Sequence, residues 1–259
     1  MINWILVTDK IPWLGTAYFR NYQSFIKFND KVWVYGGGNS GLEIWSSSDG
    51  ENFVKSNVEI PFGRRYWAYI GVLNDKLWLT GGLNWWDDNG NYIRNEYGVL
   101  AYNDVWSSSD GETWALEKSF TQMPPRGMIN GYVNYNGRLL VIGGGISNKF
   151  IVSSYNDIWS SEDGKNWKWM VKEAEFPPTT YHGIINKEGR LFLVMGAIKT
   201  NAISNLSWYS DDGGNSWKQI KYGFYKPRHA SGLINFKGKL YMVAGIRCRD
   251  VWVLDEERL

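Results

Sequence analysis

The sequence predicts an all-β fold made of repeats, and the repeat itself is the strongest observation. The pattern Trp-x-Ser-x-Asp-Gly occurs four times, and a degenerate fifth copy near the C-terminus keeps the tryptophan. The five tryptophans are Trp45, Trp106, Trp159, Trp208 and Trp252, with a mean spacing of about 52 residues. A period near 50 residues with four short strands per repeat is typical of a β-propeller blade. We therefore predict a single five-bladed β-propeller with four antiparallel strands per blade.

An apolar run that ends in glycine precedes each of these tryptophans. The five runs, each introduced by a two-residue turn, cover residues 29–37, 74–82, 136–144, 188–196 and 237–245. Each repeat therefore contains an outgoing strand, a tight turn, the apolar strand, a loop, the strand with the tryptophan, and a last strand after the Asp-Gly turn. The repeats extend over residues 16–56, 62–118, 125–171, 178–221 and 227–255, and we treat residues 1–259 as one domain.

The prolines support this division into repeats. All seven lie between the last strand of one repeat and the first strand of the next: Pro12, Pro61, Pro124, Pro125, Pro177, Pro178 and Pro227. Proline lacks the backbone N–H that a sheet ladder uses, so it is tolerated in such connections.

The ends of the chain indicate how the ring of blades closes. The last repeat stops after its third strand, whereas residues 3–8 at the N-terminus resemble the fourth strands that begin near residues 52, 113 and 166. We expect residues 3–8 to form the fourth strand of the last blade, because that pairing removes an open sheet edge. A sixth blade would have no sequence to form it.

Composition and charge exclude several other classes of protein. Aromatic residues make up 17% of the chain and glycine contributes 29 residues, which argues against disorder and coiled coil. The net charge is only +2 without a basic block, so we expect no nucleic-acid partner. No apolar stretch is long enough for membrane insertion, no secretory leader is visible, and a lone cysteine, Cys248, forms no internal disulfide. The expected location is cytoplasmic by default, with a virion or another large assembly as the alternative.

Two motifs resemble those of known propeller families. Residues 125–144, which begin with Pro125-Arg126 and end in Gly-Gly, resemble a kelch repeat, and so do residues 227–245. The Ser-x-Asp-Gly hairpins resemble the Asp-box of sialidase-type propellers, with residues 210–217 the best match in spacing. Both resemblances imply a propeller fold, but neither implies one function, because such propellers serve unrelated tasks.

The two faces of the predicted propeller differ. One face carries short turns in which Asp caps backbone amides, Gly adopts a positive φ and Trp packs between sheets, and we expect these turns to be structural. The other face carries loops of unequal length, which marks it as the binding face. Its longest excursion, residues 83–102, holds Trp85, Trp86 and Tyr92 among amide and carboxylate groups. These rings suit a sugar or peptide surface; the alternative is that they fold back over the edge of the blade.

Arginines occur near the start of four predicted innermost strands, at Arg20, at Arg64 with Arg65, at Arg126 and at Arg228, with Thr179 at the comparable point of the fourth repeat. First strands line the axis of a propeller, so converging guanidinium groups would suit a carboxylate or a phosphate. The alternative is that each arginine pairs with its neighbouring blade and only ties the ring together. Kelch domains that resemble this one bind partners with side chains just inside this position. That resemblance adds further candidates: Tyr66, Met128, Asn130, Tyr181, His182 and His229.

We expect a non-catalytic binding module that recognises a glycan or a protein surface and uses no cofactor or metal. The alternative is a sugar-acid-processing enzyme, either a sialidase-like hydrolase or a kelch-type epimerase. The Arg-Ile-Pro signature of the sialidase family is missing, and kelch-type epimerases have six blades as a rule. A copper site like that of galactose-oxidase propellers is not expected, because two histidines without a Tyr-Cys arrangement do not specify a metal. The sequence predicts no oligomeric state.

Overall fold

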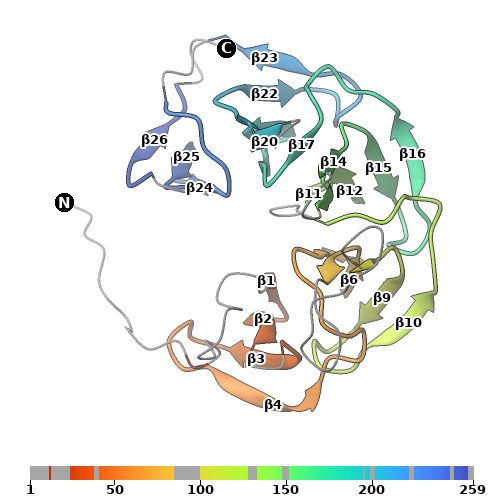
Figure 1. The fold of residues 1–259 in the computed structure, drawn as a ribbon. Helices are drawn as coiled ribbons and strands as arrows, with labels where there is room; N and C mark the ends of the chain where they lie inside the picture. Colours follow the sequence, from red (N-terminus) through yellow and green to blue (C-terminus); the bar gives the residue numbers. More distant parts are fainter. Residues whose placement is uncertain are drawn as a thin grey trace.

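The computed structural model describes residues 12, 24–37, 41–84, 100–127, 133–147, 152–194, 196–198, 202–221, 225–245 and 248–255. Within them every regular element is a β-strand, and paired strands are antiparallel (Figure 1). The prediction of an all-β fold is confirmed.

Five larger sheets follow one another along the chain, four with four strands and the last with three. Sheet I comprises β1 (Ser24–Phe28), β2 (Lys31–Gly37), β3 (Glu43–Ser47) and β4 (Val54–Glu59). Sheet II comprises β5 (Tyr69–Leu73), β6 (Lys76–Thr80), β9 (Val105–Ser108) and β10 (Ala115–Lys118). Sheet III comprises β11 (Val133–Tyr135), β12 (Arg138–Ile142), β15 (Ile158–Ser161) and β16 (Lys168–Val171). Sheet IV comprises β18 (Gly183–Lys187), β19 (Arg190–Val194), β22 (Ser207–Ser210) and β23 (Lys218–Ile220). Sheet V comprises β24 (Gly232–Phe236), β25 (Lys239–Val243) and β26 (Val251–Val253).

Three smaller sheets extend the loops that follow the second strands of sheets II, III and IV. They comprise β7 (Leu83–Asn84) with β8 (Leu100–Ala101), β13 (Gly145–Ser147) with β14 (Val152–Ser154), and β17 (Thr179–Thr180) with β20 (Ala197–Ile198) and β21 (Ala202–Ile203). Bridges from Tyr66 to Leu83 and from Gly127 to Gly145 tie the first two loops to the segments that lead into β5 and β11. We call the side of the molecule that these loops build the loop face.

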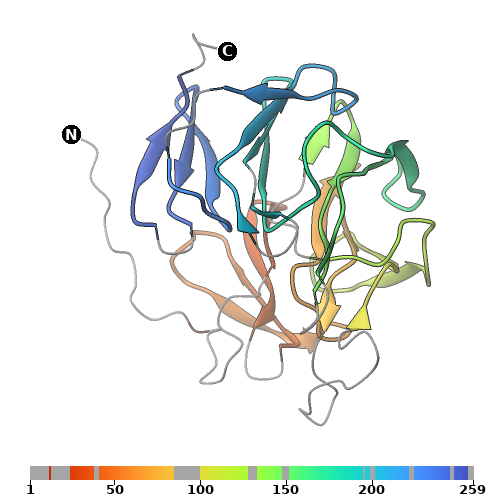
Figure 2. The ribbon, with the colours of Figure 1, turned by 45° about the horizontal axis from the view of Figure 1, so that its top comes forward.

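The larger sheets lie around a common centre, with the first strand of each sheet innermost (Figure 1), and Figure 2 gives a tilted view. The first strands contact one another in series, from β1 to β5, β11, β18 and β24. This is a propeller-like arrangement of antiparallel sheets. Residues 3–8, which the sequence predicts as the fourth strand of the last blade, lie outside the described residues.

Two-residue turns connect the first and second strands of each larger sheet, as predicted. Both central residues have a positive φ in every case, which is the type I′ geometry that matches the twist of a hairpin. The pairs are Asn29-Asp30, Asn74-Asp75, Asn136-Gly137, Glu188-Gly189 and Lys237-Gly238. These turns lie at the ends of the strands opposite the loop face, so we call that side the turn face.

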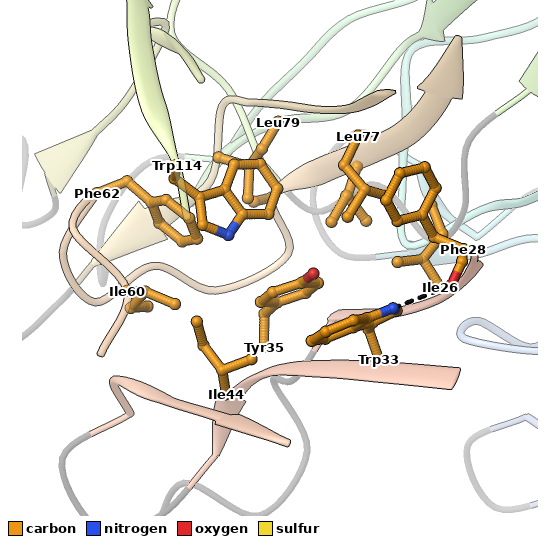
Figure 3. Close-up of a cluster of buried hydrophobic side chains, with 12 residues drawn as sticks. Ile26, Phe28, Trp33, Tyr35, Ile44, Ile60, Phe62, Leu77, Leu79 and Trp114 are labelled. Atoms are coloured by element: carbon orange, nitrogen blue, oxygen red, sulfur yellow. Dashed lines mark hydrogen bonds between the residues drawn. The ribbon is translucent and has the colours of Figure 1, made fainter. Parts of the chain in front are cut away.

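Neighbouring sheets are joined by aromatic and aliphatic side chains. Between sheets I and II the buried cluster includes Phe28, Trp33 and Tyr35 from one sheet and Leu77 and Trp114 from the other (Figure 3). The rings of Tyr35 and Trp114 meet edge to face with centroids 5.3 Å apart. Burial of each large apolar side chain contributes about 1.5–3 kcal/mol. These contacts join sheet I to sheet II.

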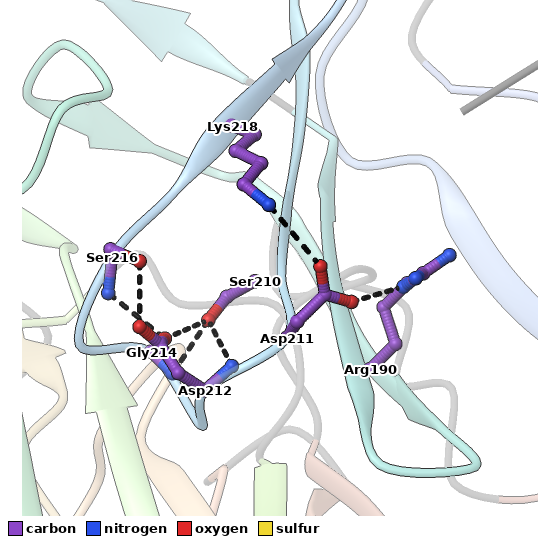
Figure 4. Close-up of polar contacts among 7 residues, drawn as sticks. All are labelled: Arg190, Ser210, Asp211, Asp212, Gly214, Ser216 and Lys218. Atoms are coloured by element: carbon purple, nitrogen blue, oxygen red, sulfur yellow. Dashed lines mark hydrogen bonds and ion pairs between the residues drawn. The ribbon is translucent and has the colours of Figure 1, made fainter.

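Each Asp-Gly turn is held by its own side chains, as predicted. In sheet IV, Asp212 accepts hydrogen bonds from the N–H and Oγ of Ser216, and the Oγ of Ser210 accepts one from the Gly214 N–H (Figure 4). Matching bonds form around Asp49, Asp110 and Asp163. These aspartates therefore serve the turns that they belong to.

Three of these turns also pack on the preceding sheet. A Cβ atom added to Gly111 would lie 2.5 Å from the ring of Trp33, which is closer than atoms can approach. A Cβ on Gly164 would overlap the ring of Trp78 in the same way, and one on Gly213 would overlap the ring of Tyr135. The φ angles of the three glycines lie between 74° and 91°, a region that other residues rarely adopt. We call this contact, a turn glycine on an aromatic ring of the preceding sheet, the turn lock.

Candidate ligand-binding site

Three of the arginines singled out in the sequence are buried and ion-paired within their own sheets. The pairs are Arg65–Asp104 at 2.7 Å, Arg126–Asp157 at 2.5 Å and Arg228–Asp250 at 2.5 Å. Each guanidinium donates to both carboxylate oxygens, and the arginine side chains are at most 2% exposed. Hydrogen bonds from Arg228 and Trp252 hold the pKa of Asp250 well below its usual range. A bidentate pair of this kind fixes the orientation of both side chains.

The other guanidinium donors are also engaged inside the sheet. In Arg126, Nη1 donates to the Gly143 carbonyl at 3.0 Å and Nε donates to the Pro124 carbonyl at 3.2 Å. The guanidinium lies over the ring of Tyr155, 4.2 Å from its centroid. Arg65 makes the corresponding contacts, with Tyr102 in the place of Tyr155. Arg228 makes the same two backbone contacts and lies 5.4 Å from the ring centroid of Tyr225. All three arginines are thus held within the framework of their own repeats.

The aspartate partners are not among the candidate residues named from the sequence, although the sequence carries a signal for them. Each aspartate stands two residues before an anchor tryptophan and accepts its Nε1–H hydrogen bond at 2.7–2.9 Å. Sheet IV has Thr179 in place of the arginine, and it has Leu206 in place of the aspartate. The two residues change together, which indicates that they belong to one structural unit.

Aromatic side chains from three sheets meet at the centre of the loop face. Trp67, Tyr181 and His229 precede the innermost strands β5, β18 and β24. The rings of Trp67 and Tyr181 are edge to face with centroids 5.0 Å apart, and the Tyr181 and His229 centroids are 5.2 Å apart. Sheets II and IV are not neighbours in the series, so the first of these contacts crosses the centre of the molecule. All three side chains are partly exposed; we call them the central aromatic cluster.

The backbone at this cluster is strained. Trp67 and Tyr181 have φ angles of 52° and 55°, and Ala230, which follows His229, has a φ of 57°. A bulky residue in this left-handed region is uncommon, and such strain costs on the order of 1–3 kcal/mol. A strained backbone conformation persists where the surrounding structure imposes it. Here the Ala230 N–H donates a hydrogen bond to the Tyr181 carbonyl at 2.9 Å, which ties two of the strained segments together. Strain of this kind is found most often at ligand clamps and active sites.

The central aromatic cluster rests on the base of the long excursion. Leu83, which is fully buried, packs against Trp67, Tyr181 and Ala101. Leu83 belongs to β7 and Ala101 to β8, so the excursion leaves and re-enters the described structure beside Trp67. The two described ends of the excursion and the cluster therefore belong to one region of the loop face.

The two histidines have different surroundings. His182 is completely buried, and this burial, which outweighs the opposite effect of the Ile142 backbone, lowers its pKa to about 4. His182 is therefore neutral near pH 7 and has no surface to offer to a ligand. Partial burial also lowers the pKa of His229, whose ring stays partly exposed beside Tyr181.

The remaining candidate residues from the sequence are not among the described members of the central aromatic cluster. Tyr66 is 3% exposed, and its backbone pairs with Leu83. Arg20, Trp85, Trp86, Tyr92, Met128 and Asn130 lie outside the described residues. Trp67 is the one member of the cluster that the sequence analysis does not identify.

The described part of the chain holds no group of three or more His, Cys, Asp or Glu side chains arranged for a metal ion. No helix capable of spanning a membrane occurs in the residues that the structure describes.

Fold and site together define a propeller-like all-β protein with partly exposed aromatic rings at the centre of one face. No protein-family model and no curated protein matches the chain. The chain is similar to a solved structure described as "Structure of YjhT", with a TM-score of 0.68 over 86% of this chain and 71% of that chain. The two sequences are 16% identical over this match, so the similarity concerns the fold alone.

Proposed function

We propose that this protein is a non-catalytic binding module that recognises a glycan or a protein surface at the centre of its loop face. The observation that carries the proposal is the convergence of Trp67, Tyr181 and His229 from three sheets. Aromatic rings offer a large apolar surface at a small cost in side-chain entropy, and they stack on sugar rings or on apolar side chains of a partner. The left-handed φ of Trp67 and Tyr181 supports a ligand-contacting role, because such strain is rarely kept without a use.

The long excursion contributes to the same proposed site. Its ends, β7 and β8, pack beside Trp67, so residues 85–99 begin and end at the central aromatic cluster. Trp85, Trp86 and Tyr92 extend the aromatic surface in this proposal, and His229 supplies a polar edge.

The engaged state of the arginines favours a binding module over a sugar-acid-processing enzyme. Such an enzyme needs a cation that is free to meet the carboxylate of its substrate. Arg65, Arg126 and Arg228 are already paired with aspartates and buried. In this proposal the three arginines hold the framework that presents the aromatic rings, and ligand contact belongs to the rings.

We further propose that the repeats form five blades, with residues 3–8 as the fourth strand of sheet V. The anchor Trp252 of β26 is 38% exposed, whereas Trp159 of β15, on which Trp169 of the fourth strand stacks, is 3% exposed. Connections between the larger sheets span residues 60–68, 119–132, 172–182 and 221–231, which is nine to fourteen residues. Residues 9–23 provide a connection of similar length from the proposed strand to β1.

The binding proposal is tested with single-residue variants on a glycan array and in affinity titrations of any glycan or protein partner that is found. We expect Trp67→Ala and Tyr181→Ala to weaken binding by at least about 30-fold, the cost of losing an aromatic anchor worth about 2 kcal/mol. Trp169→Ala is the matched control, because Trp169 is an exposed tryptophan on the outer strand β16.

Equal binding by the wild type and both cluster variants would contradict the proposed site. If the wild type turned over a sialoside or a sugar acid, and if Arg126→Ala lost this activity with its fold intact, the protein would be a sugar-acid-processing enzyme and not a non-catalytic binding module.

A further inference from the structure

Three of the innermost strands are preceded by the same two-residue arrangement. The first residue of each pair has a left-handed φ of 52°, 55° or 57°: Trp67, Tyr181 and Ala230. The second residue is buried and directly precedes β5, β18 or β24: Ala68, His182 and Ser231. Sheet IV therefore holds a titratable ring where sheets II and V have a small side chain.

His182 has no polar partner at this buried position. Its ring lies against the backbone of sheet III, since a Cβ atom added to Gly143 would be 3.4 Å from the His182 Cε1. The side chain is fully buried, and neither ring nitrogen has a hydrogen-bond partner among the described residues. Buried polar groups are nearly always hydrogen-bonded, and one left unpaired costs stability. Packing alone holds the His182 ring in place, and only its neutral form suits these surroundings.

No described side chain is placed to receive a positive charge on His182. In the segments of sheets II, III and V that contact this part of sheet IV, the carboxylates belong to complete ion pairs: Arg65–Asp104, Arg126–Asp157 and Arg228–Asp250. The other charged residues and the imidazole of these segments are Arg64, Lys226, Arg249 and His229. Within sheet IV, Glu173 is exposed, Glu175 accepts the Trp217 N–H at 3.0 Å, and Glu188 lies beyond the opposite end of β18. The low pKa of His182 accordingly has no charged side chain among its causes.

Tyr181 links the buried imidazole to the central aromatic cluster. It directly precedes His182, and it is held by ring contacts with Trp67 and His229 and by the Ala230 N–H at 2.9 Å. Its left-handed φ is strained and persists only while these contacts impose it. Moving the His182 ring into water requires the peptide unit between the two residues to move. The contacts of Tyr181 would then break together with the burial of His182.

We propose that the central aromatic cluster is acid-sensitive: it is closed while His182 is neutral and buried, and protonation of His182 expels its ring, turns Tyr181 away from its neighbours and releases the ligand. Strand β18 stays paired with β19, because this pairing begins at Gly183, after the segment that moves. The release of ligand rests on the proposed function, whereas the opening does not. The opening is tested without ligand, so failure of this inference and failure of the proposed function are distinguishable.

The direction and size of the effect follow from the pKa of His182. Burial lowers this pKa from the ordinary 6.5 to about 4 in the closed form. The closed form binds the proton more weakly than the open form, so it is favoured above pH 6.5 and loses stability as the pH falls toward 4. The ratio of open to closed molecules should therefore rise about 20-fold between pH 7 and pH 5.

The test follows hydrogen exchange of the Ala230 amide in the ligand-free full chain, corrected for the intrinsic exchange rate at each pH. We expect wild-type protection to fall about 20-fold between pH 7 and pH 5. Protection should stay constant in His182→Phe, whose ring takes no proton. His229→Gln is the matched control, because it removes the other histidine of the chain and should keep the fall. The Gly127 amide, which donates to the Gly145 carbonyl in sheet III, should keep its protection in every variant.

Equal falls in protection for the wild type and His182→Phe would overturn the proposal, because another group would then cause the opening. Simultaneous loss of protection throughout β18 and β19 would also overturn it, because the molecule would then unfold as a whole. If His182→Phe does not fold, His182→Ser replaces it, with the side chain that sheet V has at this position. NMR of the two histidine rings is an independent check: a His182 ring that titrates near pH 6.5 while the Ala230 amide stays protected contradicts the proposal.

Discussion

Asp110 illustrates how one side chain holds a turn of this protein. Its Oδ1 accepts the N–H groups of Glu112 and Thr113 at 2.8 and 2.7 Å and the hydroxyl of Ser108 at 3.1 Å. Partial burial acts to raise the pKa of Asp110, but the hydrogen bonds to the carboxylate outweigh it and leave the pKa below its ordinary value. The carboxylate therefore stabilises the fold in its charged form.

Replacing this aspartate should cost stability and leave ligand binding intact. We expect Asp110→Ala to lower the free energy of unfolding by about 0.5–2 kcal/mol, as loss of other short capping side chains does. The stabilisation is complete above the unfolded pKa of about 4 and is lost as the pH falls through the lower folded value. Urea unfolding at pH 7 and at pH 3 should show the difference between wild type and variant shrinking at the lower pH. A difference that grows on acidification would contradict this account.

In sheets II, III and V, an arginine, an aspartate and a tryptophan tie the segment before the first strand to the third strand. In sheet III this unit is Arg126, Asp157 and Trp159. Breaking a buried ion pair leaves an uncompensated charge, which is costly, whereas replacing both partners by apolar groups is far less so. Sheet IV has no charge at either position, since Thr179, whose hydroxyl donates to the Ala197 carbonyl, and Leu206 occupy the corresponding positions.

The two residues of sheet IV at these positions, Thr179 and Leu206, suggest a direct test in sheet III. We expect Arg126→Thr to lower the free energy of unfolding by about 3–5 kcal/mol, and we expect the double variant Arg126→Thr with Asp157→Leu to recover a large part of that loss. Urea unfolding of the wild type, both single variants and the double variant measures the coupling. If Arg126→Thr is as stable as the wild type but no longer binds ligand, the arginine reads the ligand and the structural role is wrong.

The strands could be predicted from the sequence, but the meeting of side chains from distant repeats could not. Strand positions follow from local signals, because each turn has its own Asn, Asp or Gly chemistry and each second strand is a short apolar run. The contact of Trp67 with Tyr181 joins repeats that are not neighbours, and it depends on how the sheets are arranged around the centre. The Arg126 and Asp157 pair depends on which strands lie side by side. The contact between Trp67 and Tyr181 leaves no local pattern in the sequence, and the only local signal for Asp157 is its place two residues before an anchor tryptophan.

The whole molecule is a series of sheets whose two ends must be joined if it is a closed ring. The first strands from β1 to β24 contact one another in order, and sheet V has three strands where the others have four. An unpaired edge on β26 would be a site for aggregation or swapping between chains. In our account residues 3–8 cover that edge, and the segment that follows leads back to β1.

The free energy of unfolding of two N-terminal variants tests this account most directly. In the proposed strand Trp4 corresponds to Trp114 and Trp167, which are 8% and 5% exposed, and Ile5 corresponds to the exposed Ala115 and Lys168. We expect Trp4→Ala to cost about 3–5 kcal/mol in urea unfolding, as for a buried tryptophan, and Ile5→Ala to stay within about 0.5 kcal/mol of the wild type. Equal and small effects of the two variants would contradict a fourth strand formed by residues 3–8.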